Sequence, residues 1–384
     1  MTLSIIPAGV VAVLLALVVS ACGESDRGAS ADGRAAAGLR VSTAGWKTDF
    51  SKHTVPLSEF RSGGPGRDGI PPIDKPKTVS QEEADTFLDD REPVLVVQQG
   101  QAVRGYPLQI LIWHEIVNDE LDARPIAVTY CPLCNSSVVF DRRVDDRVLT
   151  FGTTGNLRRS DLVMWDRQTE SWWQQLSAQA VVGKLSGERL EVLPSQTLSW
   201  ADFRRSFPDG DVLSRETGFE RDYGRNPYVG YDERDSQPFL FDGQTDDRLP
   251  AKEYVLAVFV DEDKPLVIPF SRLVRERVVN AQSGGTPFVA LYKEGVVSPL
   301  DNAAISRSED IGTSAAFDRR LDRRTLEFRA VDGGYVDRQT ASRWDITGRA
   351  IEGPLQGKRL RPLRHDQQFW FALAAFLPNA KILG

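Results

Sequence analysis

Two related stretches of sequence follow one another along the chain, and this recurrence restricts the fold more than any other feature. Five residues of the first stretch return 162 positions later with unchanged spacing. They are Pro107, Leu111, Asn118, Pro125 and Tyr130, and their counterparts are Pro269, Leu273, Asn280, Pro287 and Tyr292. Chance does not preserve so many spacings, so the pattern predicts tandem copies of one supersecondary unit. We place the copies at residues 94–213 and 254–384, where the two can share one core.

The match resumes further along each copy with a different spacing. The offset is 177 residues at Leu149 but 171 at Asp166, so the second copy lacks six residues of the region 152–165. Later matches in the first copy are Gly183, Gly187, Leu190, Trp200 and Pro208. Residues common to both copies are most simply determinants of the fold. Residues confined to the first copy are therefore candidates for function.

Strand patterns dominate both copies. Each copy begins with a predicted strand and hairpin, at 94–97 and 101–104 in the first copy and at 255–260 and 266–268 in the second. A helix follows that Pro107 or Pro269 opens, since proline needs no N–H partner in the first helical turn. On the first helix, Ile110, His114 and Val117 would share one face. Further strand-like runs lie at 126–130, 137–141, 147–151, 161–165 and 189–193, before a short helix that follows Ser199. The predicted class is α+β, dominated by strands.

The N-terminal region predicts export. Residues 5–19 are almost entirely apolar and precede Cys22, which indicates a lipoprotein signal over residues 1–22 and a lipid-modified Cys22. A transmembrane anchor is the alternative reading of the apolar run. We expect a flexible tether at 23–45, an N-terminal extension at 46–93 and a connecting segment at 214–253. The protein would then be extracytoplasmic and held to a lipid bilayer of the cell envelope.

Charge and motifs exclude several classes of partner. The net charge is −7 with acidic and basic residues interspersed, which argues against nucleic-acid binding. The glycine-rich run at 152–156 lacks the spacing and the lysine of a phosphate loop, so we expect no nucleotide cofactor. The sequence indicates no particular substrate or protein partner.

Cys131 and Cys134 are the only cysteines besides Cys22, and they occur in the first copy alone. Their counterparts are Lys293 and Val296, so the fold does not require the pair. The run after them is β-branched and aromatic, which favours a strand over the helix of thioredoxin-like enzymes. We therefore predict a turn between two strands that presents both sulfur atoms to one side, as a metal site requires.

The remaining ligands of such a site must come from elsewhere in the first copy. His114, which is replaced by Glu276 in the second copy, and Met164 would complete a soft set of thiolate, imidazole and thioether. This set favours copper(I), for metal handling or electron transfer. An oxygen from Asp161, Glu115 or Asp119 would favour zinc instead. Arg158 and Ser160, in the region that the second copy lacks, are expected to support the site, although Arg158 and Asp161 could simply form an ion pair.

Two other functions are consistent with the same residues. In a thiol–disulfide oxidoreductase, Cys131 would attack, Cys134 would resolve the mixed disulfide, and His114 would act as the base. In a non-catalytic scaffold or binding protein of the cell surface, the two cysteines would form a structural disulfide.

Several motifs resemble one known family. The motifs are SGGPGRDGIPPID, WHEIVND, TYCPLCNSSVVFDR, FGTTGNLRRSDLVMWDRQTESWW and NPYVGY, and together they resemble the Domain of Unknown Function 3179 family of exported bacterial and archaeal proteins. The resemblance extends from about Trp46 to the C-terminus. It implies no activity, but it implies that His114, Cys131, Cys134 and the stretch 160–167 belong to the family's pattern.

Overall fold

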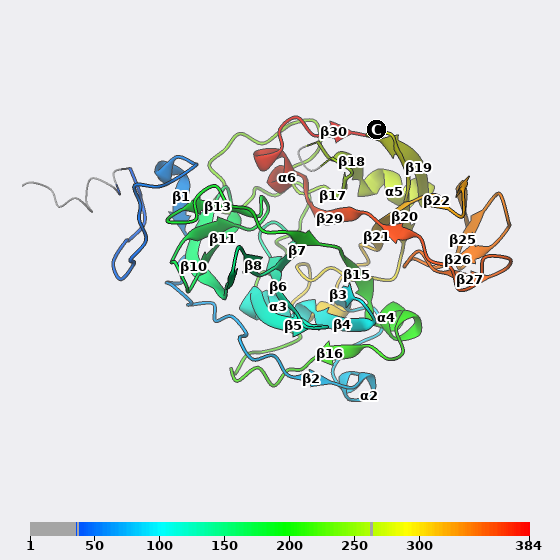
Figure 1. Ribbon diagram of the computed structural model, residues 1–384, viewed down its shortest axis with the longest axis horizontal. Helices are drawn as coiled ribbons and strands as arrows, with labels where there is room; N and C mark the ends of the chain where they lie inside the picture. The colour runs from blue at the N-terminus through cyan, green and yellow to red at the C-terminus, as the bar shows by residue number, and fades with distance from the viewer. Residues whose placement is uncertain (1–35, 37, 262–263) are drawn as a thin grey trace, which may run out of the picture.

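The computed structural model describes residues 36, 38–261 and 264–384 (Figure 1). Strands dominate this part of the chain and the helices are short, which confirms the predicted α+β class. The residues of the predicted signal, including Cys22, lie outside the described part. None of the described helices has both the length and the apolar composition needed to cross a membrane.

The first half builds its sheets in a regular order. One sheet has the order β15-β3-β4-β16-β2, a second β14-β7-β6-β5 and a third β1-β10-β11-β12-β13. The strands are β1 Phe60–Ser62, β2 Thr78–Val79, β3 Pro93–Gln99, β4 Ala102–Pro107, β5 Ile116–Leu121, β6 Arg124–Cys131, β7 Ser136–Asp141, β8 Arg143–Val144, β9 Arg147–Val148, β10 Phe151–Arg158, β11 Asp161–Asp166, β12 Trp172–Gln174, β13 Gln179–Val182, β14 Val192–Leu193, β15 Ser195–Ser199 and β16 Asp211–Leu213. The helices are η1 Leu57–Glu59, α2 Gln81–Ala84, α3 Leu108–His114 and α4 Trp200–Ser206.

The second half pairs its strands in the same order. Its sheets are β29-β17-β18-β30, β28-β21-β20-β19 and β24-β25-β26-β27. The strands are β17 Tyr254–Phe259, β18 Leu266–Pro269, β19 Val278–Ser283, β20 Thr286–Lys293, β21 Thr313–Asp318, β22 Arg320–Leu321, β23 Arg324–Thr325, β24 Phe328–Val331, β25 Gly334–Asp337, β26 Arg343–Trp344, β27 Ala350–Glu352, β28 Arg361–Pro362, β29 Arg364–Phe369 and β30 Lys381–Ile382. The helices are α5 Phe270–Glu276, η2 Ile305–Arg307 and α6 Trp370–Phe376.

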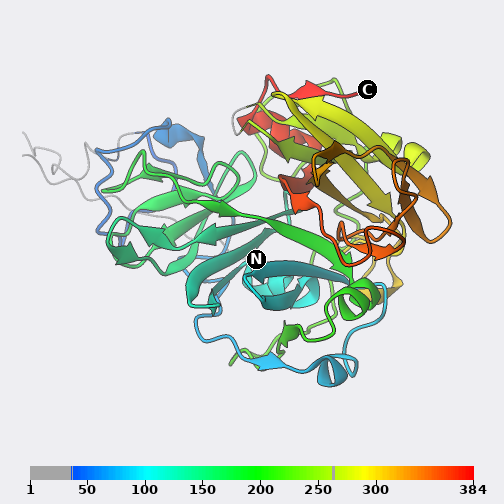
Figure 2. The same cartoon turned by 45° about the vertical axis from the view of Figure 1, so that its right-hand side comes forward.

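The two halves pack against each other along their strands (Figure 2). Strand β29 of the second half contacts β7, and β15 of the first half contacts β21. One hydrophobic cluster joins both cysteines to Phe369 and Phe371, and another joins Trp200 to Leu291 and Trp344. Because each cluster draws on both halves, burial of apolar surface stabilises them together.

Helix α3 ends earlier than the sequence pattern predicted. Glu115 follows it in the left-handed conformation (φ 57°), and the β-branched Ile116 and Val117 then continue as strand β5. Val117 therefore does not share a helix face with Ile110 and His114, and that prediction was wrong. Helix α5 ends in the same way, with Arg277 at φ 58°.

The segment before β3 covers one sheet of the first half. Phe50, Leu57 and Phe60 pack in a cluster with Trp165 and Trp172, and β1 pairs with the distal end of β10. Leu39 and Val41, in the stretch expected to be a tether, also pack against this cluster. The ordered packing thus begins before Trp46, because these apolar side chains gain burial there.

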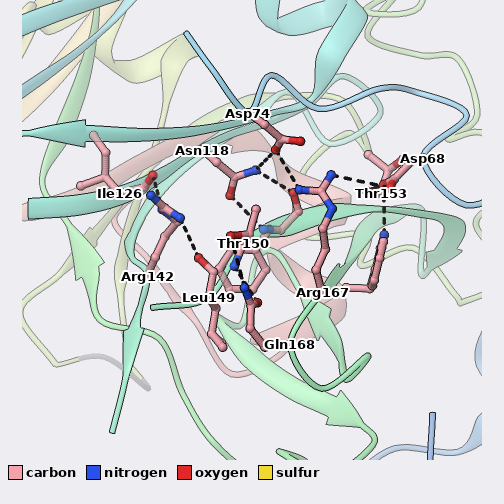
Figure 3. A network of polar contacts seen from close by, with 12 residues as sticks. Asp68, Asp74, Asn118, Ile126, Arg142, Leu149, Thr150, Thr153, Arg167 and Gln168 are labelled. Atoms are coloured by element: carbon pink, nitrogen blue, oxygen red, sulfur yellow. Dashed lines mark hydrogen bonds and ion pairs between the residues drawn. The ribbon is translucent and has the colours of Figure 1, made fainter. Parts of the chain in front are cut away.

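A polar network fixes the base of the β10–β11 hairpin (Figure 3). The Asn118 amide donates to the carbonyl oxygen of Phe151 (2.8 Å) and accepts from its N–H (2.9 Å). Asn118 also donates to Asp74 at 2.8 Å, and Arg167 bonds the same carboxylate at 2.9 Å. The N-terminal segment therefore helps to hold the hairpin in place, and the hairpin in turn reaches the cysteines.

Candidate metal centre

Cys131 and Cys134 lie in the tight turn between β6 and β7, as the sequence predicted. Cys131 is the last residue of β6, and the turn closes at Asn135, whose φ is 48°. Both are free thiols and are buried, with exposed fractions of 2% and 0%. The backbone N–H of Phe369, on β29, donates to the carbonyl oxygen of Cys134 at 3.0 Å, so the second half holds the turn from outside.

The tip of the β10–β11 hairpin lies against the two thiols. Arg159 and Ser160 form the tip with φ angles of 54° and 67°. The carbonyl oxygen of Ser160 accepts from the Cys134 thiol at 3.6 Å and from the Cys131 thiol at 3.9 Å. Asp161 Oδ1 is 3.6 Å from Cys134 Sγ, and the donor atoms of the two cysteines and Asp161 all lie within 4.8 Å of one another. The extra hairpin length of the first half thus delivers a carboxylate to the cysteine turn.

A second layer of contacts orients Asp161. Gln174 Nε2 donates to Asp161 Oδ2 at 2.5 Å, and the N–H of Leu176 donates to the same oxygen at 3.1 Å. Arg158 makes its ion pair with Glu59 at 2.7 Å, and it donates to Gln174 Oε1 at 3.4 Å. The direct Arg158–Asp161 pair considered from the sequence is therefore replaced by a bridge through Gln174. Sequence reasoning missed Gln174, which only its position in the WWQQ run could have suggested.

Glu115 adds a second buried carboxyl group to this region. Its N–H donates to Leu111 O at 2.7 Å and its carbonyl accepts from the N–H of Tyr130 at 2.9 Å, directly before Cys131. The side chain makes no hydrogen bond to another described residue. Burial raises the pKa of Glu115 to about 8, and the nearby Asp161 charge adds to the shift.

The other acidic groups show the same direction of shift. Burial raises the pKa of Asp161 to about 7, although its hydrogen bonds act against the shift. Burial also raises the pKa of both thiols, and the Asp161 charge raises them further. Burial of these four acidic groups together favours their protonated forms in the absence of a compensating cation. A raised thiol pKa is the opposite of what a nucleophilic cysteine requires.

The structure does not bring His114 to the cysteines. Its Nδ1 bonds to Pro71 O at 2.7 Å and its Nε2 bonds to the Tyr223 hydroxyl at 2.6 Å, so both ring nitrogens have partners elsewhere. Tyr223 comes from the connecting segment, which the helical pattern around His114 gave no means of anticipating. Burial lowers the pKa of His114, which favours the neutral ring.

Met164 and Asp119 also have other surroundings. Met164 is fully buried within β11, opposite Thr153 and Trp173, and strand alternation places it on the other face from Asp161. Asp119 accepts from Arg104 and from the Tyr106 hydroxyl, each at 2.7 Å. Of the oxygen donors considered from the sequence, Asp161 is the one that joins the thiols, with Glu115 nearby.

A pocket of about 840 Å³ adjoins this cluster. Glu115, Leu133 and Leu162 form the side of the pocket toward the cysteine turn. The connecting segment supplies the opposite wall, where the Tyr231 hydroxyl donates to Leu133 O at 3.1 Å. Lys252 lies 3.6 Å above the Tyr231 ring and donates to Ser236. The aromatic density of residues 214–253 was the sequence signal for this wall, whereas nothing in the sequence pointed to Lys252.

Comparison with known proteins gives one match. A family model described as "Protein of unknown function (DUF3179)" matches residues 67–380. No curated protein and no solved structure matches the chain. The match confirms the resemblance drawn from the motifs, and it covers the cysteine turn, the hairpin and both halves.

Proposed function

The chain belongs to the DUF3179 family of proteins of unknown function, and we propose that this protein binds a metal ion through Cys131, Cys134 and Asp161. The observation that carries the proposal is the convergence of these three donor groups within 4.8 Å, all of them buried. Two of the three donors are absent at the corresponding positions of the second half, where Lys293 and Val296 stand. The third comes from the longer hairpin.

The donor set favours zinc. Zinc lies about 2.3 Å from thiolate sulfur and about 2.0–2.2 Å from carboxylate oxygen, so at a tetrahedral angle the two atoms are separated by about 3.5 Å. Cys134 Sγ and Asp161 Oδ1 are 3.6 Å apart. The carboxylate is a poor ligand for copper(I), and the soft donors expected from the sequence, His114 and Met164, have other contacts.

Electrostatics supports a cation at this position. Zinc binds thiolate and carboxylate in their deprotonated forms, so it would take the place of protons that the buried groups otherwise retain. Gln174 and the N–H of Leu176 hold the Asp161 carboxylate in the manner of outer-shell partners of a metal ligand.

Three protein donors leave a fourth position on a tetrahedral ion. Glu115 lines the adjoining pocket of about 840 Å³, and a water or a small molecule from this pocket can fill that position. We therefore propose metal handling, or use of the metal to bind a small molecule, as the function.

Elemental analysis of the full-length protein purified under reducing conditions tests the proposal. We expect stoichiometric zinc, and at least a 100-fold loss of affinity in Cys131→Ser, Cys134→Ser and Asp161→Asn, because each removes one donor from a shared ion. His114→Gln and Met164→Leu are matched controls that should keep the metal. If the protein contains stoichiometric copper and both control variants lose it, the result would contradict the zinc site and support the copper(I) site with His114 and Met164 as ligands. Absence of metal with a quantitatively oxidised cysteine pair would leave the structural disulfide.

The same preparation tests the redox alternative. A thiol–disulfide enzyme would trap mixed disulfides through Cys131 in the Cys134→Ser variant, but not through Cys134 in Cys131→Ser. The burial of both thiols and their raised pKa values argue against this outcome. Trapped partners of this asymmetric kind would contradict the metal proposal.

We also propose that the halves are copies of one unit and that Cys22 carries a lipid. The common order of strand pairing supports the first proposal, and the apolar run before Cys22 supports the second. An extracytoplasmic, bilayer-anchored protein follows, with no role for nucleic acid. The Cys22→Ser variant should appear in the soluble fraction. Retention of that variant in the membrane, with residues 1–21 still attached, would favour a transmembrane anchor.

A further inference from the structure

The pocket of about 840 Å³ beside the cysteine turn has the size of a site for a small organic molecule, since such sites measure roughly 300–1,000 Å³. Most of its lining is apolar. The cysteine turn and the β10–β11 hairpin contribute leucines such as Leu133 and Leu162, and the connecting segment contributes prolines and the rings of Tyr228, Tyr231 and Phe239. Rings and prolines offer flat surfaces, which suit an aromatic ligand.

Apolar side chains also lie at the edge of the pocket. Val229 and Phe239 line it and are 59% and 54% exposed. Exposed apolar side chains beside a cavity are typical of ligand-binding sites. An apolar ligand would cover these side chains and remove their surface from water, which favours binding.

Three polar side chains interrupt this lining. The Glu115 carboxyl group, the Asn156 amide and the Tyr228 hydroxyl line the pocket, and their side chains make no hydrogen bond with the described residues. Glu115 and Asn156 are only 8% and 7% exposed. The polar atoms are not fully covered by protein, so a ligand in the pocket can reach them. A purely apolar ligand would take water from these groups and leave them without partners, which costs free energy.

The charged groups of the pocket favour a neutral ligand. Within the described lining, Glu115 is the one acidic group and Lys252 the one basic group. The Lys252 ammonium donates to Tyr231 O and to Ser236 Oγ, and it lies 3.6 Å from the Tyr231 ring. Asp232 lies close enough to stabilise its charge further. The protein therefore compensates the lysine, and an anionic ligand would share the pocket with Glu115.

A hydroxyl group matches the polar side chains that lack partners. Glu115 and Tyr228 lie close enough for their charges to interact. A hydroxyl both donates and accepts, so it can donate to the Glu115 carboxylate and accept from the Tyr228 hydroxyl. A carbonyl oxygen only accepts, so it would leave an ionised Glu115 without a partner.

We propose that this pocket binds a neutral phenol, with its ring among the apolar side chains and its hydroxyl group bonded to Glu115 and Tyr228. Asn156 offers a partner for a second polar group on the same ligand. The phenol would be the small molecule of the proposed function. Its role beside the metal rests on that function, whereas its binding to the pocket does not.

Equilibrium dialysis of the full-length protein against 2-naphthol, naphthalene, 2-naphthoate and 2-naphthylmethylamine tests the proposal, with protein-free buffer of the same composition as the reference. The compounds share one ring system and differ in one substituent. We expect one saturable site that binds 2-naphthol at least about tenfold more tightly than the other three, because a site built for a hydroxyl group discriminates against analogues without it. Equal binding of 2-naphthol and naphthalene, a preference for the anion or the amine, or no binding at all would overturn the proposal.

Two variants test the named partners of the hydroxyl group. Tyr228→Phe keeps the ring and removes only the hydroxyl, and Glu115→Met replaces the carboxyl group by an apolar side chain of similar size. Each should weaken 2-naphthol binding about fivefold or more and leave naphthalene binding unchanged, because each removes one hydrogen bond. Glu82→Met, at an exposed position of α2, is the matched control and should change neither. An unchanged preference for 2-naphthol in Tyr228→Phe would contradict the site even if Glu115→Met fails to fold.

Metal analysis separates this proposal from the metal proposal. Tyr228→Phe should keep the metal, and wild-type protein stripped of metal by a chelator should still prefer 2-naphthol to naphthalene. Stoichiometric zinc without binding of 2-naphthol would contradict the phenol site alone. Binding of 2-naphthol by a protein that takes up no metal would contradict the zinc site alone.

Discussion

The two halves differ most where their equivalent strands are connected. Four residues join β6 to β7, whereas nineteen join β20 to β21. The β10–β11 hairpin spans sixteen residues from Phe151 to Asp166, and β24–β25 spans ten from Phe328 to Asp337. The two halves thus share one order of strand pairing but differ in their connections. The first half has a tight cysteine turn and a long hairpin, and the second has a long loop and a short hairpin.

The connections differ in the charge of nearby side chains as well as in their length. Where the first half has Glu115 and Cys131, the second has Arg277 and Lys293. Lys293 forms an ion pair with Asp202, on α4 of the first half. The region around Lys293 in the second half therefore contributes to the contact between the halves. The region around Cys131 in the first half instead contains several buried acidic groups. The comparison teaches that one set of sheets can serve two purposes when only connections and a few side chains change.

The largest expected loss of stability concerns two tryptophans, one in each half. Trp173 and Trp344 are both fully buried, and each donates from Nε1 to an aspartate of the neighbouring strand at 3.0 Å. Replacing either by alanine should cost about 3–5 kcal/mol, because it removes a large core side chain and leaves a cavity. Denaturant unfolding of the two variants should give similar losses of stability. A loss confined to one half would break the equivalence.

The buried carboxyl groups of Asp161 and Glu115 should make the stability of the metal-free protein depend on pH. The pKa values of Asp161 and Glu115 are raised to about 7 and about 8, so the folded state keeps protons that the unfolded state releases. The contribution of these groups is complete below about pH 4 and is lost as the pH rises to about 8, a decrease of several kcal/mol. Thermal unfolding across this range should show the decrease.

The Asp161→Asn, Glu115→Gln double variant serves as the comparison for that measurement. It should flatten the decrease, because neither substitute titrates. Zinc added to the wild-type protein should stabilise it increasingly as the pH rises, since metal and protons compete for the same groups. A metal-free wild-type protein whose stability does not fall between about pH 5 and about pH 8 would contradict the raised pKa values.

A smaller effect is expected at the base of the hairpins. Asn118 and Asn280 make the same pair of bonds, to the backbone of Phe151 and of Phe328, at 2.8 and 2.9 Å. Asn118 is buried and also bonds to Asp74, whereas Asn280 is half-buried. We expect Asn118→Ala to cost about 2–3 kcal/mol and Asn280→Ala about 1 kcal/mol, because buried groups left without partners lose more. Midpoints of urea unfolding would rank the two, and the reverse order would contradict the role of the N-terminal segment.

The smallest effect should come from two equivalent surface ion pairs. Arg143 pairs with Asp141 and Arg320 with Asp318, each at 2.6 Å, and both arginines are about half exposed. Both aspartates are buried, but each keeps a second arginine partner, Arg124 for Asp141 and Arg361 for Asp318. Replacing Arg143 or Arg320 by alanine should therefore cost less than about 1 kcal/mol, since water and salt screen the contribution of a half-exposed arginine. The same unfolding experiment at low and high salt would show the small difference disappear. A cost above that of Asn118→Ala would mean that these pairs have a structural role in the hairpins.

Local patterns in the sequence predicted most of the strands, the helix start at Pro107 and the cysteine turn, because these features depend on neighbouring residues. The run 147–151, expected as one strand, is instead divided between β9 and the start of β10, and the run 189–193 forms a strand only at β14. The ligand set was predicted less well. His114 was expected near the thiols, but its partners are Pro71 and Tyr223, which are distant in sequence. The position of Asp161 depends on the left-handed backbone at Arg159 and Ser160. Neither residue type favours that conformation, so the sequence did not predict it. Long-range contacts of this kind require the fold.

The hydrogen bond from Phe369 to Cys134 connects two segments that are far apart in the sequence. Exchange of the Phe369 amide proton with solvent requires the cysteine turn and β29 to separate, and helix α6 begins at the next residue. The amide of a residue in the second half is therefore a natural reporter of opening in the first. Its exchange rate would record, in a single protected proton, how long the two halves remain closed over the thiols.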